Sequence, residues 1–203
     1  MIGSTDFGTV ILWTAAAFLS GSIPFSVWIG RFILRKDIRA YGDGNPGATN
    51  VKRAGGKGWF FVALMLDVSK SAFPIGLAYW INGMRGPEII PIALAPVFGH
   101  AFSPFLGFNG GKALAAAAGT WIGLTIIELP LVLIIMLVYW FYAVTVSGWA
   151  VLFTGLSGLL YLLLAKPDPV LIAVMVGEIV LTAYKHRADL RQPLAFRRFA
   201  VKP

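Results

Sequence analysis

Cysteine is absent from this 203-residue chain, and histidine occurs only as His100 and His186. The absence of cysteine excludes disulfide bonds, thiolate catalysis and cysteine-ligated zinc. Two histidines are too few for a multi-histidine metal site, and the nine acidic residues are scattered along the chain rather than grouped as a carboxylate metal site requires. We therefore predict neither a metal ion nor a cofactor.

Long apolar segments dominate the sequence. Hydrophobic residues make up 58% of the chain, and the mean hydropathy of +0.77 is too high for a soluble domain of this length. A helix needs roughly 20 apolar residues to cross a bilayer. We predict an all-α integral membrane protein in which residues 1–203 form a single domain with seven transmembrane helices. The predicted spans are 9–33, 58–81, 88–105, 112–128, 130–146, 149–165 and 168–185.

The distribution of positive charge predicts the orientation of these helices. With seven spans, the Lys and Arg residues fall on one side of the membrane except Arg85 and Lys166, on the other side, and Lys70, within a span. Basic loops mark the cytoplasmic side, so we expect the N-terminus outside and the C-terminus in the cytoplasm. Because the net charge of +8 follows this membrane topology, we predict no nucleic-acid partner. No basic residue precedes Arg31, which favours a retained first helix over a cleaved signal peptide.

A glycine-rich heptapeptide, GNPGATN at 44–50, lies in a basic loop after the first span. Glycines let a backbone close around a ligand, and successive N–H groups can cradle an anion. Amide and hydroxyl side chains add neutral donors, and nearby cations add charge. A phosphate group is the expected ligand, and the alternative is a tightly turned basic connection without a ligand. The flanking cations are Arg35, Lys36, Arg39, Lys52, Arg53 and Lys57.

Gly110-Gly111-Lys112 is a second candidate anion site, and the predicted topology places it on the same side of the membrane. If a helix begins at Lys112, its free N–H groups and the positive end of its dipole attract an anion. The alternative is an ordinary loop whose lysine extends toward the interface.

Several polar residues fall within or at the ends of the predicted spans. Asp67 and Lys70 lie three residues apart on one helical face. Charges in a bilayer either pair or line a polar cavity, so this pair is either structural or in contact with substrate. Glu178 is a third intramembrane charge. His100 and His186 lie near helix ends, where a histidine has either a functional role or an anchoring one.

Six short motifs follow one another in a set order along the chain. They are Gly21 to Phe25, Gly44 to Asn50 with Arg53, Asp67 to Lys70, Gly99-His100, Gly110 to Lys112, and His186-Arg187. This ordered set resembles the PlsY-type glycerol-3-phosphate acyltransferases of bacterial membranes over most of the chain.

The resemblance implies a seven-helix enzyme of the bacterial plasma (inner) membrane with its active site facing the cytoplasm. It implies acyl transfer from acyl phosphate to the 1-hydroxyl of glycerol 3-phosphate, which gives lysophosphatidic acid for phospholipid synthesis. The expected partners are glycerol 3-phosphate, acyl phosphate, membrane lipid and, in a transient contact, the enzyme that produces the acyl phosphate.

The resemblance also implies roles for individual residues. Lys112 and Arg53 are predicted to bind phosphate and neutralise charge, and His186 to contact a substrate phosphate or hydroxyl. Asp43 is a further catalytic candidate, because a carboxylate in this loop acts either as a general base or as a group that repels phosphate. The predicted substrate-binding residues are Gly44, Asn45, Gly47, Thr49, Asn50, Gly110, Gly111, Lys70 and His100.

Four positions depart from the family pattern. Asp43 replaces a serine, Ser71 and Ala113 each replace a glycine, and Asp189 replaces an asparagine. Two alternatives therefore stay open beside the active acyltransferase. One is a diverged or inactive paralogue with another acceptor. The other is a membrane transporter of anions or lipids that uses the intramembrane charges.

Overall fold

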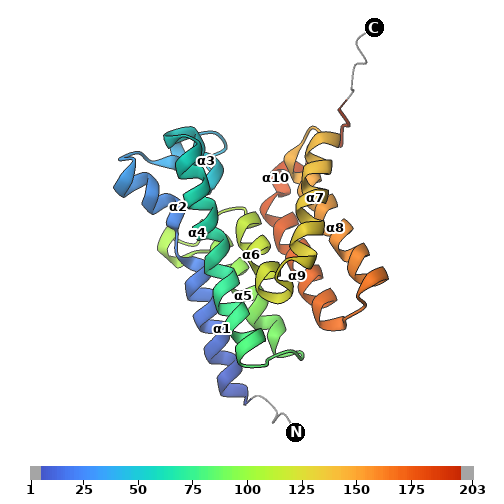
Figure 1. Ribbon diagram of the computed structural model, residues 1–203. Helices are drawn as coiled ribbons and strands as arrows, with labels where there is room; N and C mark the ends of the chain where they lie inside the picture. Colours follow the sequence, from blue (N-terminus) through green and yellow to red (C-terminus); the bar gives the residue numbers. More distant parts are fainter. Residues whose placement is uncertain (1–5, 198–203) are drawn as a thin grey trace. The chain divides into compact units, whose positions relative to one another are not determined.

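The computed structural model describes residues 6–197, and these form two compact units, one ending at Ile127 and the other beginning at Glu128 (Figure 1). Apart from an isolated antiparallel bridge between Val144 and Phe196, the described regular structure is helical. This agrees with the all-α prediction.

The first unit is built from helices α1 to α6. Their bounds are Phe7–Ser22 (α1), Phe25–Trp28 (α2, continued by a π-helix over Ile29–Ile33), Ala48–Gly55 (α3), Lys57–Gly76 (α4, continued by a π-helix over Leu77–Ile81), Ile89–Ala101 (α5) and Leu114–Thr125 (α6). Short 3₁₀ turns lie at Ile38–Ala40 and Pro104–Leu106. The α1 helix packs on α5, and α4 packs on α6.

The second unit contains α7 (Glu128–Ala143), α8 (Ser147–Ala165), α9 (Pro169–Lys185) and α10 (Arg187–Leu190). The α8 helix packs against both α7 and α9. Glu128 at the start of α7 accepts hydrogen bonds from Tyr161 and Lys166 near the end of α8. Each of these contacts joins one end of a helix to the opposite end of its antiparallel neighbour.

A helix lies in each of the seven predicted ranges. Within residues 6–197, four segments are long and apolar enough to cross a membrane alone: Phe7–Ile33, Lys57–Ile81, Ile89–Leu106 and Ser147–Ala165. The apolar helices Leu114–Thr125 and Glu128–Ala143 are shorter. The condition set for the second anion site, a helix that begins at Lys112, is not met, because α6 begins at Leu114 with Ala113 as its N-cap.

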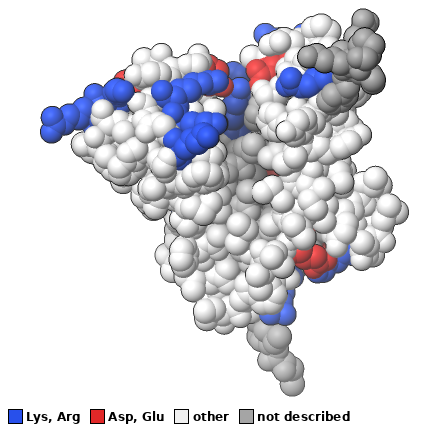
Figure 2. Space-filling model, turned by 45° about the horizontal axis from the view of Figure 1, so that its top comes forward, with Lys and Arg blue, Asp and Glu red and all other residues white. Residues whose placement is uncertain are grey.

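Positive charge gathers at one end of the first unit, where α3 and the start of α4 lie (Figure 2). The start of α1 lies at the opposite end of that unit (Figure 1). Large apolar side chains such as Phe7, Leu12, Phe61 and Phe73 are exposed along the helices between these ends. Exposed apolar sides between charged ends, with most of the positive charge at one end, are what a lipid-embedded helical unit requires.

Close approach of α4 to α6 depends on Gly119. A Cβ atom at this position would collide with the carbonyl oxygen of Val68 on α4. Small residues at such crossings let the helix backbones come together, which is a common basis of packing in membranes.

The α1 helix is interrupted at Ile23-Pro24, and α2 begins only at Phe25. The interruption leaves the carbonyl oxygens of Ser22 and Ile23 without the helical N–H donors that an unbroken helix would supply. Ser103 Oγ donates to the Ser22 carbonyl at 2.6 Å, and Lys70 Nζ donates to the Ile23 carbonyl at 2.8 Å. Side chains from other elements thus complete the backbone hydrogen bonds of the break.

Lys70 also forms a buried ion pair. Its Nζ atom lies 2.8 Å from Asp67 Oδ1, and both side chains are only 2% exposed. The second carboxylate oxygen, Asp67 Oδ2, accepts a hydrogen bond of 2.7 Å from Ser26 Oγ on α2. The pair therefore ties α4 to the segments on both sides of the break in the first helix.

We predict that Lys70→Met lowers the free energy of unfolding by about 3–5 kcal/mol, because it leaves Asp67 charged and buried without its partner. The double variant Asp67→Asn/Lys70→Met should lose less, since no unpaired charge remains. Thermal unfolding of the detergent-purified protein measures both. A single variant as stable as the unmodified protein would show that the ion pair has no structural role.

Ala113 occupies the left-handed helical region, with φ 63° and ψ 10°, and is 1% exposed. This conformation costs an L-residue roughly 1–2 kcal/mol, although glycine loses more entropy on folding. We predict that Ala113→Gly raises the free energy of unfolding by up to about 1 kcal/mol. Ala118→Gly, at an exposed position within α6, should lower it by about 0.5–1 kcal/mol. Equal effects of the two changes on unfolding temperature would contradict strain at Ala113.

Candidate active site

The loop that contains GNPGATN turns sharply before α3. Gly42 and Gly44 have positive φ angles of 58° and 73°, a conformation that glycine adopts without steric cost. The guanidinium group of Arg53 lies against Gly42, where a Cβ atom would collide with it. Asp43 is therefore presented between two glycines, next to the arginine predicted to bind phosphate.

Asn50, on the first turn of α3, organises this loop and is 1% exposed. Its Nδ2 atom donates to the Asn45 carbonyl at 2.9 Å and to Asp43 Oδ1 at 3.3 Å. Its Oδ1 atom accepts a hydrogen bond of 2.7 Å from Arg53 Nη1. Asn50 thus fixes the shape of the loop and orients the Arg53 guanidinium.

The second loop, Gly110-Gly111-Lys112, meets the first through Asn45. The backbone N–H of Lys112 donates to Asn45 Oδ1 at 3.0 Å, across 67 positions of sequence. The N–H of Gly111 donates to the His100 carbonyl at 3.0 Å, which attaches the loop to the end of α5. The structure therefore brings the two predicted anion-binding loops together.

Asp43 lies where the cationic side chains of Arg53, on α3, and Lys112, in the second loop, converge. Its Oδ2 atom is 3.0 Å from Lys112 Nζ, and its Oδ1 atom is 3.9 Å from Arg53 Nη1. Oδ1 also accepts the backbone N–H of Asn45 at 3.3 Å. The side chains of Asp43 and Arg53 are each 48% exposed and that of Lys112 is 27% exposed, so a dissolved ligand can reach all three.

The electrostatics of this cluster keep Asp43 ionised. Burial by itself would raise the pKa of its carboxyl group, but the hydrogen bond from Lys112, the Asn45 N–H and the charge of Lys112 together lower it below the usual value. The ion pair with Lys112 is therefore present at neutral pH and is lost only as the pH falls through this lowered pKa. A carboxylate with a lowered pKa is a weak proton acceptor at neutral pH.

A small polar cavity of about 10 Å³ lies behind the loops, close to the size of one water molecule. The side chains of Lys70 and His100 border it and are 2% and 7% exposed, and His100 Nδ1 lies 4.0 Å from Asp67 Oδ1. Lys70 and His100 were predicted to bind substrate, but they border this cavity and not the exposed surface around Asp43. The lining residues are Ser22, Ile23, Pro24, Pro46, Asp67, Lys70, His100, Ser103, Leu106 and Gly111.

The remaining candidates occupy other places. Thr49 is exposed on the first turn of α3, and Gly47 is the N-cap of that helix. His186 belongs to the second unit, where it caps α9, is 4% exposed and has its Nδ1 atom 2.9 Å from the Thr182 carbonyl. Asp189, in the same unit, accepts a hydrogen bond of 3.1 Å from Ser147. The role of His186 at the substrate stays a prediction.

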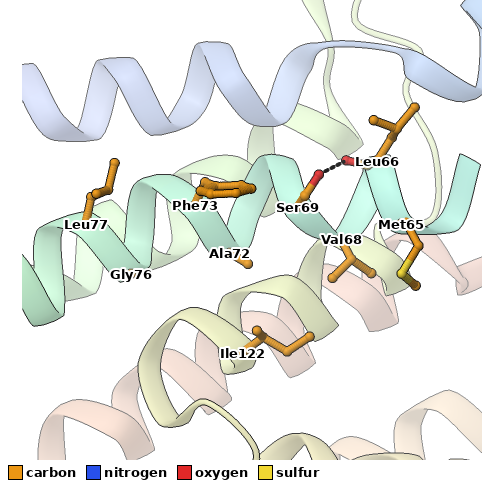
Figure 3. A pocket seen from close by; sticks show the side chains of 9 residues that line it. All are labelled: Met65, Leu66, Val68, Ser69, Ala72, Phe73, Gly76, Leu77 and Ile122. Atoms are coloured by element: carbon orange, nitrogen blue, oxygen red, sulfur yellow. Dashed lines mark hydrogen bonds between the residues drawn. The ribbon is translucent and has the colours of Figure 1, made fainter. Parts of the chain in front are cut away.

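An apolar groove along α4 was missed by sequence reasoning. It encloses about 570 Å³ and is lined mainly by α4 side chains, with Ile122 of α6 at its margin (Figure 3). Helical spacing places Met65, Ser69 and Phe73 on the opposite face of α4 from Asp67. Their four-residue spacing was the available signal, but a lipid-facing helix is apolar on every exposed face, so the pattern did not stand out.

Comparison with known proteins identifies relatives of this chain. A family model described as glycerol-3-phosphate acyltransferase matches residues 11–195. The glycerol-3-phosphate acyltransferase of Ralstonia pickettii (strain 12J) is 34% identical over 194 residues, which cover 91% of this chain and 90% of that protein. The enzyme of the same description from Anaeromyxobacter sp. (strain Fw109-5) is 43% identical over 127 residues. That match covers 61% of this chain and 62% of the relative, slightly less than two thirds of the relative's length.

The fold is similar to two crystal structures of PlsY (YgiH), an integral membrane glycerol 3-phosphate acyltransferase. Its glycerol 3-phosphate form gives a TM-score of 0.82 at 28% identity. Its lysophosphatidic acid form gives a TM-score of 0.80 at 27% identity, and each match covers 91% of both chains. With the family match extending over most of its length, this chain is a multi-pass, all-helical membrane protein that belongs to the glycerol-3-phosphate acyltransferase family.

Proposed function

We propose that the chain transfers an acyl group from acyl phosphate to the 1-hydroxyl of glycerol 3-phosphate and releases lysophosphatidic acid. The observation that carries this proposal is the convergence of Lys112 and Arg53 on one anion, the Asp43 carboxylate, at 3.0 and 3.9 Å. Two accessible cations, Lys112 from the second loop and Arg53 from α3, suit a phosphate group. Family membership and the substrate-bound form of PlsY support the same reaction.

The reaction requires few protein groups beyond these two cations. An acyl phosphate is an activated mixed anhydride, so no covalent nucleophile of the protein is required. The hydroxyl oxygen of the acceptor bonds to the carbonyl carbon, the bond from that carbon to the phosphate oxygen breaks, and phosphate leaves with the electron pair. The hydroxyl proton passes to a substrate phosphate oxygen. Lys112 and Arg53 offset the charges of the two phosphates and of the developing oxyanion, which lets the hydroxyl oxygen approach the carbonyl carbon.

Preorganisation of the cations supports this role. Asn50 orients the Arg53 guanidinium, and Asn45 fixes the backbone of Lys112. Because these hydrogen bonds are formed before any substrate arrives, less reorganisation is needed during the reaction. This assigns Asn45 and Asn50 to positioning, with Gly44, Gly47, Gly110 and Gly111 shaping the two loops around the ligand.

We also propose a location and an orientation. The chain crosses the bacterial plasma membrane seven times as one domain, with the N-terminus outside and the phosphate-binding loops at the cytoplasmic face. The gathering of positive charge beside α3 supports this orientation (Figure 2). A cytoplasmic site would receive glycerol 3-phosphate from solution, and acyl phosphate from the enzyme that makes it.

A transport function has less support. Transport would employ Asp67 and Lys70 as a polar path, but these two side chains neutralise each other and complete the hydrogen bonds of the helix break. The polar cavity beside them holds only about 10 Å³. The described part of the first unit therefore favours a site at one membrane face.

The proposed reaction is tested by comparing two acyl donors, acyl phosphate and acyl-CoA. Protein reconstituted in lipid and supplied with glycerol 3-phosphate should form lysophosphatidic acid from acyl phosphate and none from acyl-CoA, as detected by mass spectrometry of the lipid extract. Product from acyl-CoA alone would contradict the proposed donor. No product from either donor, with folded protein verified, would favour a paralogue with another acceptor.

We predict that Lys112→Ala lowers acyl transfer at least about 100-fold while the protein still folds, since one charge-stabilising donor typically contributes that much. Lys57→Ala is the matched control, because Lys57 is an exposed cation of the same basic end. Its turnover should stay within about twofold of the unmodified protein. Near-normal turnover in Lys112→Ala would remove Lys112 from the site.

A further inference from the structure

We infer that the Asp43 carboxylate is a built-in competitor of substrate phosphate: it occupies the cationic site of Lys112 and Arg53, and a substrate phosphate must displace it to bind. This inference deepens the proposed function and rests on it. The pattern implied by the family resemblance has a serine at this position, so the competing charge departs from that pattern.

Both oxygens of the carboxylate are engaged in the way a bound anion would be. Oδ2 lies 3.0 Å from Lys112 Nζ. Oδ1 accepts from the Asn45 N–H and from Asn50 Nδ2, each at 3.3 Å, and lies 3.9 Å from Arg53. A backbone N–H, an amide and two cations are the set of groups that proteins direct at phosphate oxygens. Asp43 therefore fills the same set of contacts that the proposed reaction assigns to a substrate.

A phosphate dianion and the Asp43 carboxylate cannot both keep these contacts. Two anions at hydrogen-bonding distance from one lysine repel each other strongly. The incoming phosphate carries more charge and more acceptor oxygens than a carboxylate, so it can replace the carboxylate. The replacement weakens binding by the free energy needed to remove Asp43 from its partners.

The local backbone permits that movement. Asp43 lies between Gly42 and Gly44, whose φ angles of 58° and 73° belong to a region open to glycine. Its side chain is already 48% exposed, so it can turn into water, where its charge is solvated. Asn50 and Arg53 are anchored on α3, so the carboxylate can leave while the cations stay in place.

The alternative role for Asp43 is that of a general base. The lowered pKa of its carboxyl group disfavours proton abstraction at neutral pH, and its ion pair with Lys112 occupies one of its two oxygens. The two roles predict opposite results when the charge is removed. Loss of a base lowers turnover, whereas loss of a competitor tightens the binding of phosphate ligands.

The test is calorimetric titration of the full-length, detergent-purified protein with glycerol 3-phosphate and, separately, with inorganic phosphate. Asp43→Asn keeps the size of the side chain, and Asp43→Ser restores the residue of the family pattern. Asp37→Asn is the matched control, because it removes a carboxylate of the same loop whose ion pair is with Arg39.

We expect the dissociation constant for both ligands to fall at least about tenfold in Asp43→Asn and Asp43→Ser, and to stay within about twofold in Asp37→Asn. Unchanged or weaker binding in both Asp43 variants, with unfolding temperatures confirming intact folds, would overturn the inference. A tightening of equal size in Asp37→Asn would also overturn it, because the effect would then be general charge repulsion.

Acyl transfer, measured in parallel, separates this inference from the proposed function. Tighter phosphate binding without lysophosphatidic acid formation in any variant would support the inference and refute the proposed reaction. Lysophosphatidic acid formation by the unmodified protein, with no tightening in the Asp43 variants, would do the reverse. A fall in turnover of at least about 100-fold in Asp43→Asn, at unchanged affinity, would identify Asp43 as the base and overturn the competitor role.

Discussion

The interrupted first helix leaves buried carbonyl oxygens that need hydrogen-bond donors, and Lys70 meets this constraint. Its ammonium group binds the Ile23 carbonyl and is itself neutralised by Asp67, which in turn accepts a hydrogen bond from Ser26. Asp67 also lies close to His100, whose carbonyl oxygen fixes the second glycine loop. A continuous set of polar contacts thus leads from the apolar interior to the loops that hold the candidate active site.

The candidate active site holds side chains of opposite charge, and hydrogen bonds fix the positions of its cations. Asn45 and Asn50 fix Lys112 and Arg53 before a ligand arrives, and Asp43 offsets their positive charge. Without this carboxylate, the two neighbouring cations would repel each other and loosen the site. The same carboxylate that stabilises the empty site competes with the ligand, so stability of the loops and affinity for phosphate work against each other.

Much of this arrangement followed from the sequence, because it depends on local patterns. Apolar length predicted a helix in each of the seven ranges, and charge placement predicted that the two glycine loops share one face; the bond between Asn45 and Lys112 agrees with that. The left-handed Ala113 and the start of α6 at Leu114 were not predictable, since glycine is expected there. The partners of Asp43 also depend on tertiary packing across many residues, which no local pattern encodes.

The measurement that tests the central claim most directly is a structure of this protein with glycerol 3-phosphate bound. The account predicts the phosphate group within hydrogen-bonding distance of Lys112 Nζ and the Arg53 guanidinium, with the Asp43 carboxylate turned away from both. A phosphate bound elsewhere, with the Asp43–Lys112 ion pair intact, would contradict the assignment of the two glycine loops as the phosphate site.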